Sequence, residues 1–187
     1  MLDFARSRRS FVAIALLAIA LLGFDGCAHV HQPTRVAPAD ADVNQKALNL
    51  IKRYEALRLT AYRYAGQWLI GYGHAGGVTP GLTITKAQAE RYLDQDLGRC
   101  ERAIERAVTV AVTANEFSAM AALCYNIGAT SFVGSSVVER LNAGDRAGAA
   151  DAFLMWTKIT VSGEKREATA LRARRAEERK LFLATSA

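Results

Sequence analysis

The amino-acid sequence predicts an α+β protein with two lobes, one small and β-containing, the other helical. Apolar residues recur at helical spacing over residues 42–57, aromatic residues alternate with small or polar ones over 60–72, glycines and turn residues follow to 84, and helical spacing returns from Thr85 onward. One helix, a small sheet and then several helices are typical of an α+β arrangement. The 187 residues suit one such domain, predicted at residues 42–187, with additional sequence before it.

The additional sequence at the N-terminus predicts export. An apolar run over residues 11–24 is shorter than the ~20 residues of an ordinary spanning helix, and with the preceding arginines it matches a secretory signal. Gly26-Cys27 resembles a bacterial lipoprotein cleavage site, at which Cys27 is lipidated, although Asp25 stands where a small neutral residue is usual. Residues 1–27 are therefore predicted to be either a signal peptide or an uncleaved, releasable signal anchor.

Residues 28–41 are rich in alanine, contain two prolines and lack a clear period, so they are predicted to be a tether. The folded part that follows is then exported to the periplasm, where it is tethered to a membrane or released from it.

The first folded elements are predicted to be a helix over residues 42–57, with Glu55 at its end, and a small sheet. Between Glu55 and Glu90 the chain has no acidic residue. Tyrosine, tryptophan and isoleucine alternate with small or polar residues over 60–72, which indicates half-buried strands. Glycines at four positions from Gly71 to Gly77 would weaken any long strand, so the sheet should be small and irregular.

The remaining chain predicts helices. Thr85-Lys-Ala-Gln88 and Thr113-Ala-Asn-Glu116 are capping boxes, in which two backbone N–H groups are satisfied reciprocally at a helix start. The apolar stripes that follow are most simply core-facing and suggest no cofactor. Further helices are predicted over residues 145–156 and over the arginine-rich residues 168–183. Those arginines are either a solvated face or a link between the lobes.

Charge and cysteine content narrow the function classes. The formal net charge of +6 favours a polyanionic partner, which is nucleic acid, anionic lipid or anionic cell wall. No zinc finger, RNA-recognition motif or phosphate-binding glycine loop is visible, so nucleic acid is not expected. The cysteines and histidines lack metal-ligand spacing, so no metal is expected. Cys100 and Cys124 either pair or remain buried free thiols, and the second reading is favoured because both fit apolar helix positions.

A set of short motifs spans roughly residues 45–183. It comprises Tyr54-Glu-Ala-Leu-Arg-Leu-Thr-Ala-Tyr62, Ile70-Gly-Tyr-Gly-His74, Val78-Thr-Pro-Gly81, Ile84-Thr-Lys-Ala-Gln-Ala89, Leu123-Cys-Tyr-Asn-Ile-Gly128, Phe132 with Ser135, Leu141-Asn142, Trp156, and Arg174-Arg175 with Glu178. In this order the motifs resemble the phage-type lysozymes, glycoside hydrolase family 24, also called endolysins.

The resemblance implies a lysozyme-like fold with a cleft between its lobes. It implies cleavage of the β-1,4 bond between N-acetylmuramic acid and N-acetylglucosamine in peptidoglycan strands during host lysis, by a monomer without cofactors. Glu55 matches the family's general acid. The alternative interpretation is that Glu55 is a solvated carboxylate at a helix end. An acid that protonates a leaving oxygen works best in an apolar setting, which the aromatic hairpin after Glu55 is able to supply.

The sequence departs from the family pattern at two positions. The residue nine positions after the acid is usually Asp or Cys, and the residue five positions before His74 is usually Thr. Tyr64 and Leu69 stand there, and the loop between them is one residue shorter. In the family these partners hold or activate the attacking water, for which a tyrosine hydroxyl is a poor base and a leucine side chain has no hydrogen-bonding group.

Three outcomes follow from these departures. Hydrolysis continues with Tyr64, His74 or a loosely held water. Alternatively, Glu55 acts alone with the substrate's own N-acetyl group, which would make the protein a lytic transglycosylase. In the third outcome the protein is a catalytically impaired lipoprotein that binds peptidoglycan. His74 is expected to fix its turn rather than to transfer a proton.

Overall fold

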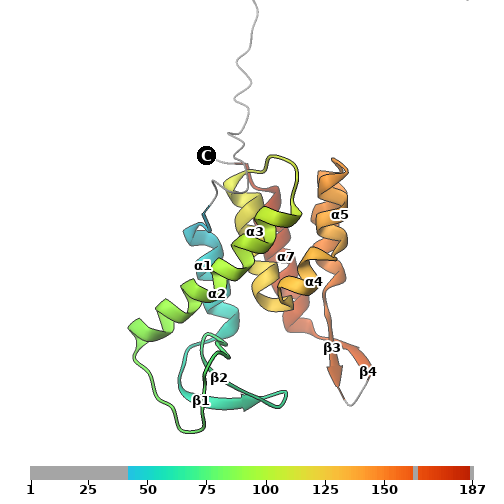
Figure 1. Ribbon diagram of the computed structural model, residues 1–187. Coiled ribbons are helices and arrows are strands. Elements are labelled where there is room, and N and C mark those ends of the chain that lie inside the picture. Colours follow the sequence, from blue (N-terminus) through green and yellow to red (C-terminus); the bar gives the residue numbers. More distant parts are fainter. Residues whose placement is uncertain (1–41, 162–163, 186–187) are drawn as a thin grey trace, which may run out of the picture. The chain divides into compact units, whose positions relative to one another are not determined.

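The computed structural model describes residues 42–161 and 164–185, shown in Figure 1. The predicted signal segment at 1–27 and the tether at 28–41, including Cys27, lie outside the described residues. Within the described part, no helix is both long enough and apolar enough to cross a membrane.

The helix that carries Glu55 and the hairpin after it match the sequence predictions. Helix α1 spans Gln45–Glu55, and Asn44 caps its start by accepting from the N–H of Ala47. Strands β1 (Arg58–Tyr64) and β2 (Gln67–Gly71) form an antiparallel hairpin directly after α1 (Figure 1). The sheet is small and irregular, as expected, because the register shifts between Arg58 and Tyr62.

The loop between β1 and β2 consists of two residues. Ala65 and Gly66 both have positive φ values, 47° and 85°, as a tight primed turn requires. The register then pairs Tyr64 with Gln67 and Tyr62 with Leu69. Because side chains alternate across a strand, Tyr62, Tyr64 and Leu69 share one face of the hairpin.

The helical lobe forms around α3. Helices α2 (Lys86–Ala107) and α3 (Ala114–Ile127) begin at Thr85 and Thr113, and both predicted capping boxes are confirmed. Helix α3 is buried over most of its length and packs against α1, α2, α4 (Ala129–Val133) and α7 (Thr169–Leu183). Helix α7 confirms the predicted last helix, and α6 (Arg146–Ala152) with the 3-10 turn η2 (Phe153–Met155) corresponds to the one expected at 145–156.

Two features of the lobe were not predicted. Helix α5 (Ser136–Asn142) begins where Ser135 accepts from the N–H of Val138, and with α4 it fills the interval after α3. A second antiparallel hairpin, β3 (Lys158–Val161) and β4 (Glu164–Glu167), precedes α7. Its charged, exposed strand β4 lacks the apolar alternation by which strands are recognised.

The preference for free thiols was wrong. Cys100 on α2 and Cys124 on α3 form a disulfide, with their Cα atoms 5.7 Å apart. Both residues do occupy apolar stripes, as predicted, but these stripes face each other across the α2–α3 contact. The bridge therefore joins two core helices close to the end of α3.

Candidate active site

A cavity of about 370 Å³ lies where α1, the β1–β2 hairpin and the end of α3 meet. Its lining is mostly aromatic and polar, and Glu55 is the one carboxylic acid in it among the described residues. The lining residues are Glu55, Tyr62, Tyr64, Leu69, Tyr72, Gly73, Tyr125 and Asn126.

The local backbone places Glu55 at the edge of this cavity. Glu55 is the last residue of α1, and Ala56 ends the helix with a positive φ of 53°, which a residue with a Cβ rarely adopts. Gly73 has a φ of 101°, and a Cβ built on it would lie 3.9 Å from Glu55 Oε2. Glycine at this position thus tolerates the backbone conformation and keeps the space beside the acid open.

A buried charge network from α7 holds the Glu55 carboxyl group. Arg174 Nη1 donates to Glu55 Oε1 at 2.6 Å, while its other nitrogens donate to Glu178 Oε1 at 2.9 Å and to the carbonyl of Ala122 at 3.3 Å. The side chain of Glu55 is 21% exposed and that of Arg174 only 3%. Arg174 is therefore an immobile support that orients a partly exposed acid.

Arg175 completes the network from the other side. It bonds Glu178 and Asn126, and its Nε donates to the carbonyl of Trp156 at 2.9 Å. Burial raises the pKa of Glu178, although the two guanidinium groups favour its carboxylate, and burial lowers the pKa of Arg175, although Glu178 favours its charged form. The predicted arginine face is thus divided, because Arg174 and Arg175 are buried links whereas Arg172 is exposed.

Tyr62 and Tyr125 contribute phenolic hydroxyl groups to the cavity. Burial raises the pKa of Tyr125 well above its usual value, and burial also raises the pKa of Tyr62, assisted by the charge of Glu55 and opposed by Arg58. The Tyr125 hydroxyl donates to the carbonyl of Tyr72 at 2.9 Å, so it ties α3 to the hairpin. Neither phenol is a base at neutral pH.

Both departures from the family pattern lie in the cavity wall. Tyr64 is 66% exposed at the end of β1, and Leu69 is partly buried on β2 opposite Tyr62. The hairpin therefore presents an aromatic and apolar surface in which Tyr64 supplies a hydroxyl and Leu69 supplies no polar group.

His74 does not line this cavity. Its Nδ1 lies 3.0 Å from Asp96 Oδ2, its Nε2 lies 2.9 Å from the carbonyl of Gly76, and its ring stacks on Tyr92 with 4.2 Å between centroids. Both ring nitrogens are thus engaged within the protein, and the turn-fixing role of His74 stays a prediction.

Several lining residues were not singled out from the sequence. Tyr62 and Tyr125 belong to the recognised motifs, but nothing in their spacing showed that they would share a cavity with Glu55. The i, i+4 spacing of Arg174 and Glu178 was a usable signal, because oppositely charged residues at this spacing face each other on a helix. Within residues 42–161 and 164–185, no three His, Cys, Asp or Glu side chains gather in a metal-binding arrangement.

Among the described residues, one carboxylic acid lines an aromatic cleft between a β-hairpin lobe and a helical lobe, which is the arrangement expected from the resemblance to lysozyme-like glycosidases. Comparisons with known proteins identify its family. A family model described as phage lysozyme matches residues 52–178. An endolysin of Acyrthosiphon pisum secondary endosymbiont phage 1 is 40% identical over 141 residues, which cover 75% of this chain and 97% of that protein.

Solved structures agree with this assignment. The muramidase domain of SpmX from Asticaccaulis excentricus is 34% identical with a TM-score of 0.73, covering 77% of this chain and 99% of that one. A further relative by sequence is a SAR-endolysin of Enterobacteria phage P21, which is 34% identical over 93 residues, covering 49% of this chain and 56% of that protein. The chain belongs to the phage lysozyme family, and it is a glycoside hydrolase that degrades peptidoglycan in host lysis.

Proposed function

We propose that Glu55 is the general acid that cleaves the β-1,4 bond between N-acetylmuramic acid and N-acetylglucosamine. The observation that carries this proposal is the position of Glu55, the one acid among the described residues that line the cavity, fixed by Arg174 at 2.6 Å. Its proton passes to the leaving glycosidic oxygen as the bond to the muramic C1 breaks. Arg174 acts as a positioning residue, since it reaches the substrate only through Glu55.

The attack on C1 is the step that the hairpin wall influences. In the hydrolytic route, a water beside Tyr64 or in the open cleft attacks C1 and gives up one proton, which restores the protonated form of Glu55 directly or through solvent, and a reducing muramic end is released. In the second route, the N-acetyl oxygen of the same sugar attacks C1, and the sugar's C6 hydroxyl then displaces it and returns a proton to Glu55. That route forms a 1,6-anhydro end and needs one protein carboxyl group. The described lining of the cavity contains no second acid, which supports the N-acetyl route as an alternative to hydrolysis.

The experiment uses residues 42–187 with purified peptidoglycan and identifies the released ends by mass. Wild-type protein should release muropeptides, Glu55→Gln should lose at least a hundredfold in rate, and Glu105→Gln, an exposed acid on α2, should match wild type. Reducing ends indicate hydrolysis, and 1,6-anhydro ends indicate the N-acetyl route. Binding by wild type and Glu55→Gln without fragments from either would instead support the wall-binding alternative.

The domain plan is part of the proposal. Residues 1–27 would be a signal peptide or anchor, 28–41 a tether and 42–187 the catalytic domain of an exported protein. The likeness to a SAR-endolysin supports a membrane-associated N-terminus. Metabolic labelling with a lipid precursor tests the lipoprotein form, because it should mark the full chain but not Cys27→Ala. An unlabelled full chain would leave the uncleaved anchor as the proposed form.

A further inference from the structure

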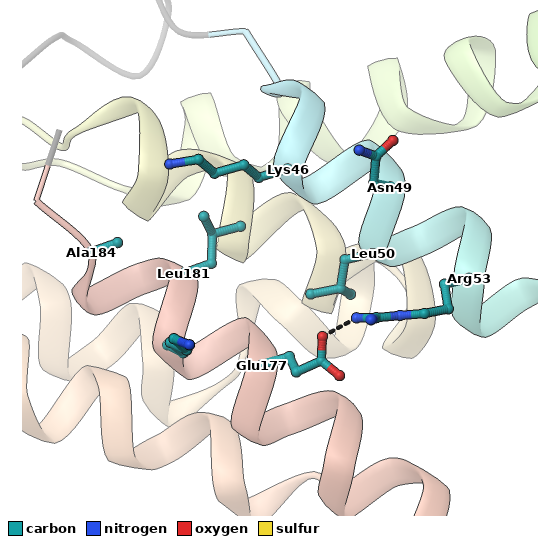
Figure 2. Close-up of a pocket in the computed structure, with 8 residues that line it drawn as sticks. Lys46, Asn49, Leu50, Arg53, Glu177, Leu181 and Ala184 are labelled. Atoms are coloured by element: carbon teal, nitrogen blue, oxygen red, sulfur yellow. Dashed lines mark hydrogen bonds and ion pairs between the residues drawn. The ribbon is translucent and has the colours of Figure 1, made fainter. Parts of the chain in front are cut away.

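A second and larger cavity, about 630 Å³, lies between α1 and α7 and shares no lining residue with the active-site cavity. Residues at i, i+3, i+4 and i+7 line it from α1 and from α7 with its C-cap residue Ala184, so one continuous stripe of each helix faces the groove. The α1 stripe is Lys46, Asn49, Leu50 and Arg53, and the α7 stripe is Glu177, Lys180, Leu181 and Ala184 (Figure 2). We call this cavity the α1–α7 groove.

The groove has an apolar floor and a cationic rim. Leu50 and Leu181 are 6% and 8% exposed and belong to the hydrophobic core. The rim carries three cations against one carboxylate, Glu177. That carboxylate is occupied, because it pairs with Arg53 (Figure 2) and accepts from the Tyr54 hydroxyl at 2.8 Å.

Lys46 and Lys180 give the rim positive charge that Glu177 does not neutralise. Both side chains are exposed, and within the described part of the chain neither forms an ion pair. Asn49 adds an exposed amide beside them, although it also accepts from Gln45 at 2.7 Å. Two ammonium groups and an amide above an apolar floor fit an anionic headgroup with attached apolar chains better than they fit a neutral sugar.

The N-terminal segment joins the fold at the same end. Asn44 caps α1 two residues before Lys46, and its amide donates to Asn115 Oδ1 at 2.9 Å. Asn115 in turn donates to the carbonyl of Ala184, which lines the groove, at 3.1 Å. The first described residues of the fold are therefore fastened beside the groove.

We propose that the α1–α7 groove docks on anionic phospholipid in the membrane that holds the N-terminal segment. The inference rests on the proposed membrane association of residues 1–41. Fourteen residues, 28–41, separate the predicted signal segment from the start of the fold, so a weak headgroup site on the fold would remain close to the bilayer. Since the active-site cavity has a separate lining, docking leaves Glu55 free to meet peptidoglycan.

Vesicle binding tests the proposal with residues 42–187, a part that contains the described core and corresponds to nearly the whole of a related endolysin. Flotation with phosphatidylglycerol and phosphatidylcholine vesicles (1:1) at low salt should show binding that pure phosphatidylcholine lacks. The Lys46→Gln/Lys180→Gln variant should bind roughly thirtyfold more weakly, at about fivefold per lysine. The control Lys158→Gln/Lys165→Gln removes two exposed lysines from the β3–β4 hairpin and should bind as wild type.

Three outcomes would overturn the proposal. They are equal binding to the two kinds of vesicle, equal weakening in the control variant, and a groove-dependent interaction with insoluble peptidoglycan instead of lipid. Glu55→Gln should bind vesicles normally, and the groove variant should cleave peptidoglycan normally. Failure of lipid binding and failure of the proposed catalysis are therefore distinguishable.

Discussion

Replacing Glu178 by glutamine should be among the most damaging single substitutions in this protein. The side chains of Glu178 and Arg175 are both 0% exposed, and Glu178 also bonds Arg174. The variant removes the negative charge but keeps the volume, which leaves Arg175 as a buried cation with neutral partners only, Asn126 and the carbonyl of Trp156. Breaking a buried ion pair from one side costs about 3–5 kcal/mol of unfolding free energy.

A loss of this size corresponds to a fall in melting temperature of about 6–20 °C, at roughly 2–4 °C per kcal/mol for a protein of this size. Urea denaturation of residues 42–187, followed by circular dichroism, measures the loss of unfolding free energy directly. Arg179→Gln is the matched control, because it breaks the α7 ion pair with Asp151, whose side chain is 63% exposed, and should cost at most about 1 kcal/mol. If Glu178→Gln loses no more than this control, the network does not support the fold as argued.

Two further predictions concern the cleft wall and the ion pair between α1 and α2. Tyr64→Asp should raise the release of reducing ends about tenfold or more, because it returns a carboxylate to a cavity in which Glu55 is the one described acid. Tyr64→Asn controls for the change in size, and equal rates for the two variants would contradict the argument. On α2, the hydrogen bond from Lys52 lowers the pKa of Glu90 below its ordinary value of 4.5, and the Tyr72 hydroxyl also donates to Glu90. Between the lowered pKa of the folded state and 4.5, the unfolded chain binds more protons than the folded one. The stability that Glu90 contributes is therefore present above pH 4.5 and is lost as the pH falls through the lowered native pKa. Glu90→Gln should lower the free energy of unfolding by up to about 1 kcal/mol at pH 7. In urea titrations below pH 4.5, the stability of this variant should fall less steeply with pH than that of wild type, and an equally steep fall would refute the assignment.

Local signals in the sequence predicted those elements that local interactions determine. Thr85 and Thr113 begin helices because each capping box satisfies its own backbone groups within four residues. Ser135 carried a similar but weaker signal, and the short helix after it was missed. The hairpin before α7 was missed because its first strand is only four residues long and its second strand, β4, contains no apolar residue.

Contacts between distant segments were only partly predictable. Cys100 and Cys124 each fit a core stripe, and it is the approach of α2 to α3 that pairs them. Arg174 is 119 residues away from Glu55 in sequence, so the support for the proposed acid appeared only in the folded chain. Tyr125 meets the Tyr72 carbonyl for the same reason, across 53 residues.

The shortened loop connects the sequence departure to the chemistry of the cleft. A two-residue turn at Ala65 and Gly66 places Tyr64 at the end of β1, on the same face as Tyr62 and Leu69. This face is able to pack against a sugar ring, but it offers an incoming water only phenolic hydroxyls, which are poor bases at neutral pH. The proton donor and the group that attacks C1 are therefore separable questions in this protein. In our proposal, Glu55 donates the proton and Arg174 orients it. The mass of the released ends decides whether water or the substrate's own N-acetyl group attacks C1.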